Sequence, residues 1–306
     1  MDLPEISDLI VQFDPQTGQR LPVVQAEVIQ KFLSTGSNKA AKIVASIPSQ
    51  DGILLESAVD AILLRSHIEM QRLSEEFMHG SRVREVLEDL ILAFRLKGVP
   101  PPYRVVDLGC GTGFVLRWIA AHGGLGADVQ LIGADFNSTL IKAAQDYAQL
   151  EHLPVNFVVA NAFGLPESAS IIISTGVLHH IGTSQLESFF AEHARAQTIA
   201  FAHWDFQPSP IVPFGSWLFH VSRFREPLAR HDGIRSALRV HTAQTLLRAA
   251  ASKHTSSTYS LGVYNPLLGN LPIKRVFHAV MGIRSDIMPE FQIASKQRFS
   301  RWHAWS

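Results

Sequence analysis

Three glycines at alternate positions follow an acid in the segment Val105-Val-Asp-Leu-Gly-Cys-Gly-Thr-Gly-Phe114. An apolar run precedes this loop and a helix-like segment follows it. The loop is therefore predicted at the carboxyl end of a strand, where open parallel sheets bind ligands. The dinucleotide pattern would need a glycine at Phe114, and the P-loop pattern would need a lysine that this segment lacks. The glycines therefore favour a ligand that has a ribose but no pyrophosphate.

A second acid, Asp135, stands at the predicted tip of the next strand. An acid in this position can accept hydrogen bonds from both hydroxyls of a ribose. Charged hydrogen bonds of this type contribute about 1.5–3 kcal/mol each, enough to decide the affinity for a cofactor. The alternative is that Asp135 only caps the helix that begins near Ser138.

Strands and helices must alternate to hold these acids at one edge of a sheet. Short apolar strands separated by helices predict an α/β fold with a doubly wound, mostly parallel, Rossmann-like sheet. Two more strands are expected as a C-terminal β-hairpin, which gives seven in total. The predicted strands are 104–107, 129–134, 154–160, 170–175, 197–204, 256–264 and 275–282. The predicted helices of this region lie near 113–122, 138–150, 183–194 and 242–252.

Three regions are predicted along the chain. Residues 1–98 form an N-terminal helical region, because Leu, Ile and Val recur there at three- and four-residue spacing until a proline run after Gly98 breaks the pattern. Residues 99–285 form the Rossmann-like domain, in which 206–241 is an ordered insertion too long for an ordinary connection. Residues 286–306 form a C-terminal tail.

Composition narrows the cellular setting and the partners. Lys plus Arg and Asp plus Glu number 27 each, so no basic surface for nucleic acid is indicated. Cys110 is the only cysteine, which favours a reducing compartment. Signal-peptide features, a membrane-spanning apolar run and metal-ligand spacing are not found. We expect a cytoplasmic protein with no metal, no membrane span and no nucleic-acid partner. The sequence leaves open whether the protein forms a homodimer.

Four segments together resemble the class I S-adenosylmethionine-dependent methyltransferases. The first two are Val106–Gly113 and Gly133-Ala-Asp-Phe-Asn137. Val159–Pro166 resembles the third-strand segment of that family, and Ile173-Ser-Thr-Gly-Val-Leu-His-His-Ile181 the fourth, in the form found among small-molecule and quinone-type members. The resemblance covers about residues 104–205. It implies S-adenosylmethionine as the cofactor and a small hydrophobic or aromatic methyl acceptor.

The resemblance also implies a cofactor-binding set. The glycine loop and the acid before it would hold the amino acid end, Asp135 the ribose, Phe136 the adenine face and Asn161 the adenine edge. Asn161 stands where many relatives have Asp, and Ser170 stands where the fourth strand often begins with Asp. The full set is Asp107, Gly109, Cys110, Gly111, Asp135, Phe136, Asn161, Ala162 and Thr175.

Histidines are the candidates for a catalytic base, because a hydroxyl or phenol acceptor needs a group with a pKa near neutrality. His179 and His180 follow the fourth predicted strand, where the methyl group would emerge, and His203 ends the fifth. His180 and His203 are the predicted catalytic residues. Methylation of RNA or protein, or a cofactor-binding module without activity, remain alternatives at this stage.

Overall fold

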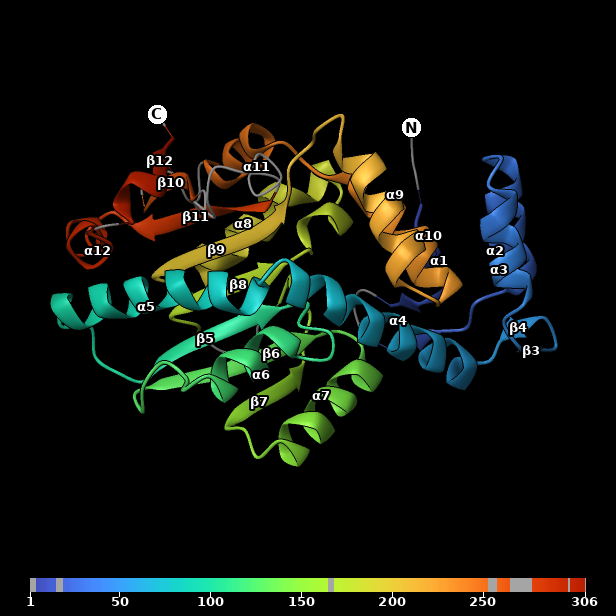
Figure 1. Ribbon diagram of the computed structural model, residues 1–306, viewed down its shortest axis with the longest axis horizontal. Coiled ribbons are helices and arrows are strands. Elements are labelled where there is room, and N and C mark those ends of the chain that lie inside the picture. The colour runs from blue at the N-terminus through green and yellow to red at the C-terminus, as the bar shows by residue number, and fades with distance from the viewer. Residues whose placement is uncertain are drawn as a thin grey trace. The chain divides into compact units, whose positions relative to one another are not determined.

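Eight strands form one sheet in the part of the chain that the structure describes, which is residues 4–14, 19–164, 168–252, 258–264, 277–296 and 298–305 of a computed structural model (Figure 1). The strands are β5 (Tyr103–Leu108), β6 (Val129–Asp135), β7 (Val155–Val159), β8 (Ile171–Thr175), β9 (Ala200–Phe206), β10 (Tyr259–Tyr264), β11 (Phe277–Arg284) and β12 (Trp302–Ala304). Their order across the sheet is β12-β10-β11-β9-β8-β5-β6-β7.

The parallel part of the sheet confirms the doubly wound prediction. Strands β7, β6, β5, β8 and β9 pair in parallel, with a reversal of order at β5 and β8. Strands β10 and β11 pair antiparallel as the predicted hairpin, although the segment that joins them lies outside the described residues. The prediction of seven strands missed β12, which pairs antiparallel with β10 inside the predicted C-terminal tail. Three residues are too few to show an alternating pattern.

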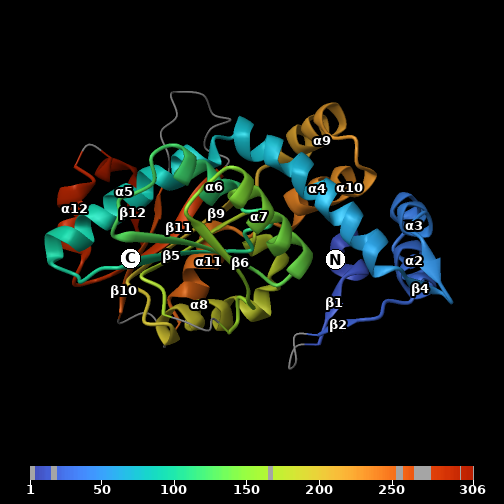
Figure 2. The same ribbon diagram turned by 90° about the horizontal axis from the view of Figure 1, so that it is seen from below.

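Helices cover both faces of this sheet (Figure 2). One face carries α5 (His79–Lys97), α6 (Phe114–Ala121), α7 (Ser138–Leu150) and α12 (Met288–Ala294). The other carries α8 (Leu186–Arg195) and α11 (Ala243–Ala250). Short 3-10 helices among the described residues are Leu178–His180, Thr183–Gln185 and Phe299–Arg301.

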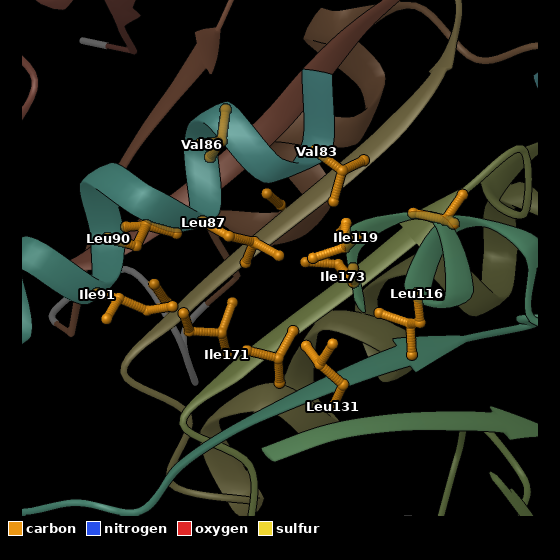
Figure 3. Close-up of a cluster of buried hydrophobic side chains, with 14 of the residues drawn as sticks. Val83, Val86, Leu87, Leu90, Ile91, Leu116, Ile119, Leu131, Ile171 and Ile173 are labelled. Carbon is orange, nitrogen blue, oxygen red and sulfur yellow. The ribbon is translucent and has the colours of Figure 1, made fainter. Parts of the chain in front are cut away.

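Helix α5 shows why its sequence forms this arrangement. Apolar side chains at three- and four-residue spacing, among them Val83, Leu87 and Ile91, are no more than 1% exposed and pack on the sheet (Figure 3). Each such side chain contributes about 1.5–3 kcal/mol when it is fully buried. The helix ends at Gly98, which adopts φ +77°, and the prolines that follow cannot continue it.

The chain divides into two compact units. The first comprises Met1–Leu73 and Pro210–Arg239, and the second comprises Ser74–Ser209 and Val240–Ser306. Residues 1–73 of the predicted N-terminal helical region thus share a unit with most of the predicted insertion, whereas residues 74–98 belong to the second unit. The elements of the first unit are α1 (Ile6–Ile10), β1 (Gln12–Phe13), β2 (Arg20–Leu21), α2 (Gln25–Ser34), α3 (Asn38–Ala45), β3 (Ser49–Gln50), β4 (Ile53–Leu54), most of α4 (Glu56–Glu76), α9 (Val212–Arg223) and α10 (Pro227–Arg239).

Long-range contacts hold the first unit together. The carboxylate of Asp232 in α10 accepts hydrogen bonds from the amides of Ile6 and Ser7, at 2.8 and 2.9 Å, and so caps α1. Arg239, at the end of the same helix, forms ion pairs with Glu5 and Asp8. Among all described helices, none is both long and apolar enough to cross a membrane.

Candidate active site

The glycine loop joins the end of β5 to the start of α6 and needs glycine at its alternate positions. Gly109, Gly111 and Gly113 adopt φ values of +65°, +54° and +72°, a region that other residues rarely enter. A Cβ on Gly113 would lie 2.3 Å from the ring of Phe157, so the loop also packs too closely for a side chain. The amide of Cys110 donates to the carbonyl of Ala134 at 3.1 Å, which ties the loop to β6.

Asp135, at the end of β6, is bound to the glycine loop and is only 6% exposed. One oxygen, Oδ2, accepts from the amide of Gly111 at 3.0 Å, and the other, Oδ1, accepts from the amide of Asn137 at 2.9 Å. Burial raises the pKa of this carboxyl, although these amide hydrogen bonds oppose the shift. Asn137, not Asp135, caps α7, because its side chain accepts from the amides of Thr139 and Leu140. The capping alternative for Asp135 is therefore excluded.

Asp107 is a buried acid with one unpartnered oxygen. It is 2% exposed, and its Oδ1 makes no hydrogen bond to any described residue. Burial and the neighbouring charge of Asp135 raise the pKa of Asp107 to about 8. A carboxyl group in this state favours a cationic partner, because a nearby positive charge stabilises its ionised form. An ammonium group meets that requirement, so Asp107 fits the amino end of an amino acid.

The residues predicted to contact adenine lie at the ends of β6 and β7. The Phe136 ring is 54% exposed and offers a flat apolar face. Asn161 is exposed, and its Oδ1 accepts from the amide of Phe163 at 2.9 Å. That oxygen has a second lone pair for a further donor. Ala162 is half-buried. The hydroxyl of Ser170 accepts a hydrogen bond from the amide of Arg104 at 3.1 Å, so Ser170 links the residue before β8 to the start of β5.

The two neighbouring histidines after β8 occupy different environments. His179 is 7% exposed, and its amide and Nδ1 both contact Asp205, at 3.0 Å from Oδ2 in each case. Burial alone would raise the pKa of Asp205, but the contacts with His179, together with the hydrogen bond from the amide of Phe206, outweigh burial and lower that pKa. His180 is exposed and lies within electrostatic range of Asp135. Thr175 precedes this turn, on the side of the sheet that Asp107 faces.

His203 projects from the opposite face of the sheet to Asp107, the acid that precedes the glycine loop. Its neighbours along β9, Ala202 and Trp204, belong to the apolar cluster on the α5 face, so His203 projects from the α8 face. Asp107 projects from the α5 face, because Val106 and Leu108 belong to the α8 cluster.

Hydrogen bonds occupy both ring nitrogens of His203. Its Nδ1 lies 2.8 Å from the Ser174 hydroxyl, and its Nε2 lies 2.8 Å from Nε2 of His193. Burial drives the pKa of His203 well below its usual value, and His193 adds to that shift. This placement gives no support to His203 as a base.

The site residues predicted from the sequence include neither His79 nor Arg82. Both lie on the buried side of α5, at 3% and 6% exposure. A signal was present, since these polar residues occupy positions of the helix that otherwise carry apolar side chains. Their position over the sheet, however, depends on contacts with Phe277 of β11, which the sequence does not reveal.

Comparisons with known proteins agree with this geometry. A family model described as a methyltransferase domain matches residues 105–198. Cyclopropane-fatty-acyl-phospholipid synthase of Escherichia coli is 29% identical over 91 residues, which cover 30% of this chain and 22% of that protein. The match thus spans only about a fifth of that relative's length.

Similar solved structures include two methyltransferases. Magnesium protoporphyrin IX methyltransferase from Synechocystis shares 16% identity at a TM-score of 0.43, with 85% of this chain and 99% of that chain covered. A plantazolicin methyltransferase in complex with SAH shares 12% identity at a TM-score of 0.49, with 85% and 95% covered. Residues 105–198 therefore match a methyltransferase domain, and the glycine loop and Asp135, which resemble the class I S-adenosylmethionine-dependent methyltransferases, lie within that match.

Proposed function

We propose that this chain is an enzyme that transfers a methyl group from S-adenosylmethionine to a small acceptor. One observation carries the proposal: a buried acid with an unpartnered oxygen, Asp107, stands beside a second acid, Asp135, that is already hydrogen-bonded to the glycine loop. An amino acid joined to a ribose needs these two groups side by side. In the β5–β6 register Asp107 pairs with Gly133, two residues before Asp135, so the two carboxyls project from the same face of neighbouring strands.

The residues around this pair have distinct tasks in the proposal. Asp107 accepts from the ammonium group, while the remaining lone pairs of Asp135 accept from the ribose hydroxyls. Phe136 lies along the adenine, and Asn161 meets its edge. The loop amides and Thr175 fix the position of the amino acid end, which aligns the reacting atoms.

Methyl transfer requires alignment and one proton acceptor. When bound, S-adenosylmethionine supplies an electrophilic methyl group and retains the electron pair of the broken C–S bond on sulfur. A hydroxyl acceptor loses its proton as the new bond forms. His180 is the group that we assign to receive this proton, because it is exposed beside the turn that follows β8. His203 has no such role, since its nitrogens are occupied within the core.

Calorimetry on the purified full chain tests the cofactor assignment. We expect S-adenosylmethionine and SAH to bind the unmodified protein and Asp135→Ala to abolish that binding. Asp146→Ala is a matched control, because Asp146 is an acid on the exposed surface of α7 that pairs with Lys142. Absence of binding to the unmodified protein, or equal binding by Asp135→Ala, would contradict the proposal. Transfer of a labelled methyl group to a panel of small molecules then tests activity.

A further inference from the structure

Five buried nitrogen atoms in the second unit make no hydrogen bond to any residue within the described ranges. They are Nδ1 and Nε2 of His79, Nε and Nη1 of Arg82, and Nε1 of Trp204. These side chains are 3%, 6% and 0% exposed, respectively. A buried guanidinium that has lost its water needs an anion and hydrogen-bond acceptors in exchange. Unpartnered donors concentrated at one place therefore point to a ligand.

Two of the three side chains contact Phe277 on the α5 face of the sheet, and the third, Trp204, projects from the same face. The His79 ring stacks on Phe277, with ring centroids 4.2 Å apart and planes 6° from parallel. The guanidinium carbon of Arg82 lies 5.9 Å from the centre of the same ring. In the β9–β11 register, Phe277 pairs with Phe206, and Ala279, two residues further along β11, pairs with Trp204. Phe277 and Trp204 thus project from the same face.

This position differs from that of the proposed cofactor. The glycine loop and Asp135 follow β5 and β6, whereas Phe277 belongs to β11, and β8 and β9 lie between β11 and β5. Neighbouring strands are about 4.8 Å apart, so β11 is about 14 Å from β5. A ribose at Asp135 lies on the β6 side of β5, away from His79 and Arg82. Thr175 pairs with Trp204 across β8 and β9, so the amino acid end of the cofactor and the donors adjoin there. The donors therefore lie on the side of the sheet that is left for the methyl acceptor.

The donors define the charge of what they bind. Guanidinium and indole groups only donate, and a neutral imidazole donates from one nitrogen. Burial and the nearby Arg82 lower the pKa of His79 to about 3, so the ring is neutral and Arg82 carries the positive charge. Glu85 lies within electrostatic range of Arg82. Its Oε1, however, already accepts from the Tyr264 hydroxyl at 2.9 Å and from Arg301.

Aromatic rings surround these donors. Phe77 meets Phe206 edge-on at a centroid distance of 5.8 Å, and Phe206 contacts Phe277 at 5.5 Å. Phe77 and Phe206 are half-buried, so they are the members of the cluster that solvent reaches. A ligand here would meet apolar rings first and nitrogen donors behind them. A planar oxyanion on an apolar body matches that order, because the guanidinium fork binds carboxylates with two parallel hydrogen bonds.

We propose that the methyl acceptor carries a carboxylate, which Arg82 and Trp204 bind, while Phe77, Phe206 and Phe277 contact the apolar part next to it. This inference rests on the proposed methyltransferase function and adds the substrate class to it. The methyl group is transferred either to the carboxylate oxygen or to another atom of the acceptor. In both cases Arg82 and Trp204 recognise the carboxylate.

Calorimetry on the SAH-loaded full chain tests the inference with four probes: benzoate, phenylacetate, cinnamate and octanoate, each compared with its primary amide. We expect at least one carboxylate to bind tenfold or more tightly than its amide. Arg82→Gln should remove this preference and change SAH affinity by less than twofold. Trp204→Phe, which keeps an aromatic ring but loses the N–H and the second ring of the indole, should weaken the same carboxylate several-fold and provides a second variant if Arg82→Gln does not fold.

Arg84→Gln is the matched control, because Arg84 lies on the exposed side of the same helix and pairs with Glu88. It should leave every probe unchanged. Equal binding of acids and amides, no binding of any carboxylate, or a loss of SAH affinity in Arg82→Gln would overturn the inference. The last result would assign the donors to the cofactor instead. Failure of the unmodified protein to bind SAH would instead overturn the proposed function on which the inference depends.

Discussion

Asp107 allows a direct test of how the amino end of the cofactor is bound. Its pKa is raised to about 8 by burial and by Asp135. At pH 7 a group with this pKa is protonated in about nine of ten molecules. A bound ammonium group stabilises the ionised carboxylate and lowers that pKa. We therefore expect SAH binding at pH 7 to release about 0.9 proton from Asp107.

Calorimetry in phosphate and in Tris measures this release, because the two buffers differ in their ionisation enthalpy. SAH affinity should also fall by about tenfold for each pH unit below 8, as long as the bound form stays ionised. Asp107→Asn has nearly the same shape and no titrating group. It should show no such proton release, and it should lose about 1.5–3 kcal/mol of binding free energy.

The same residue makes a prediction about stability. The pKa of Asp107 is higher in the folded protein than the value of about 3.9 in an unfolded chain, so the unfolded state loses its proton first. Stability of the ligand-free protein should fall as the pH rises from about 4 to 8, by at most about 6 kcal/mol. Asp107→Asn should lack this decline. Proton release at pH 7 that is zero, or equal in the variant, would refute the reasoning.

Three further predictions concern the loop and the histidines. Gly113→Ala should lower the free energy of unfolding by about 2 kcal/mol or more, because its Cβ would collide with Phe157. Gly124→Ala, at φ +63° with nothing within 4 Å, should lose only the backbone contribution of about 1 kcal/mol in denaturant unfolding. His203→Gln should reduce stability by about 1–3 kcal/mol with unchanged SAH affinity, and a weaker affinity at full stability would contradict its structural placement. His180→Gln should slow turnover by about 10²-fold or more without a change in SAH binding, and unchanged turnover would remove it as the base.

Features determined by neighbouring residues could be predicted from the sequence. The helix at 138–150 has the predicted bounds, because its apolar periodicity is regular and Asn137 supplies a cap at the start. The strands β5, β6 and β8 were located by apolar runs within one or two residues of their ends. The glycine loop and Asp135 followed from the order of strand, loop, helix and acid.

Features that depend on distant partners could not be predicted. β12 is too short for a pattern and is defined by its pairing with β10. The environment of His203 depends on His193, which lies on α8 ten residues earlier and meets it only after the crossover. The place of Arg82 depends on Phe277, almost two hundred positions away. Local periodicity carries no information about such pairs.

The discontinuous first unit has a consequence for how this protein can be cut or recombined. Residues before Leu73 and residues Pro210–Arg239 depend on each other, since Asp232 caps α1 and Leu228 packs into the apolar core of the N-terminal segment. A truncation that removes only the N-terminal part would leave an apolar helix surface and an uncompensated carboxylate behind. The two segments therefore form one folding unit although they are far apart in the sequence. A minimal catalytic fragment, or a shorter related protein, should lack both segments or keep both.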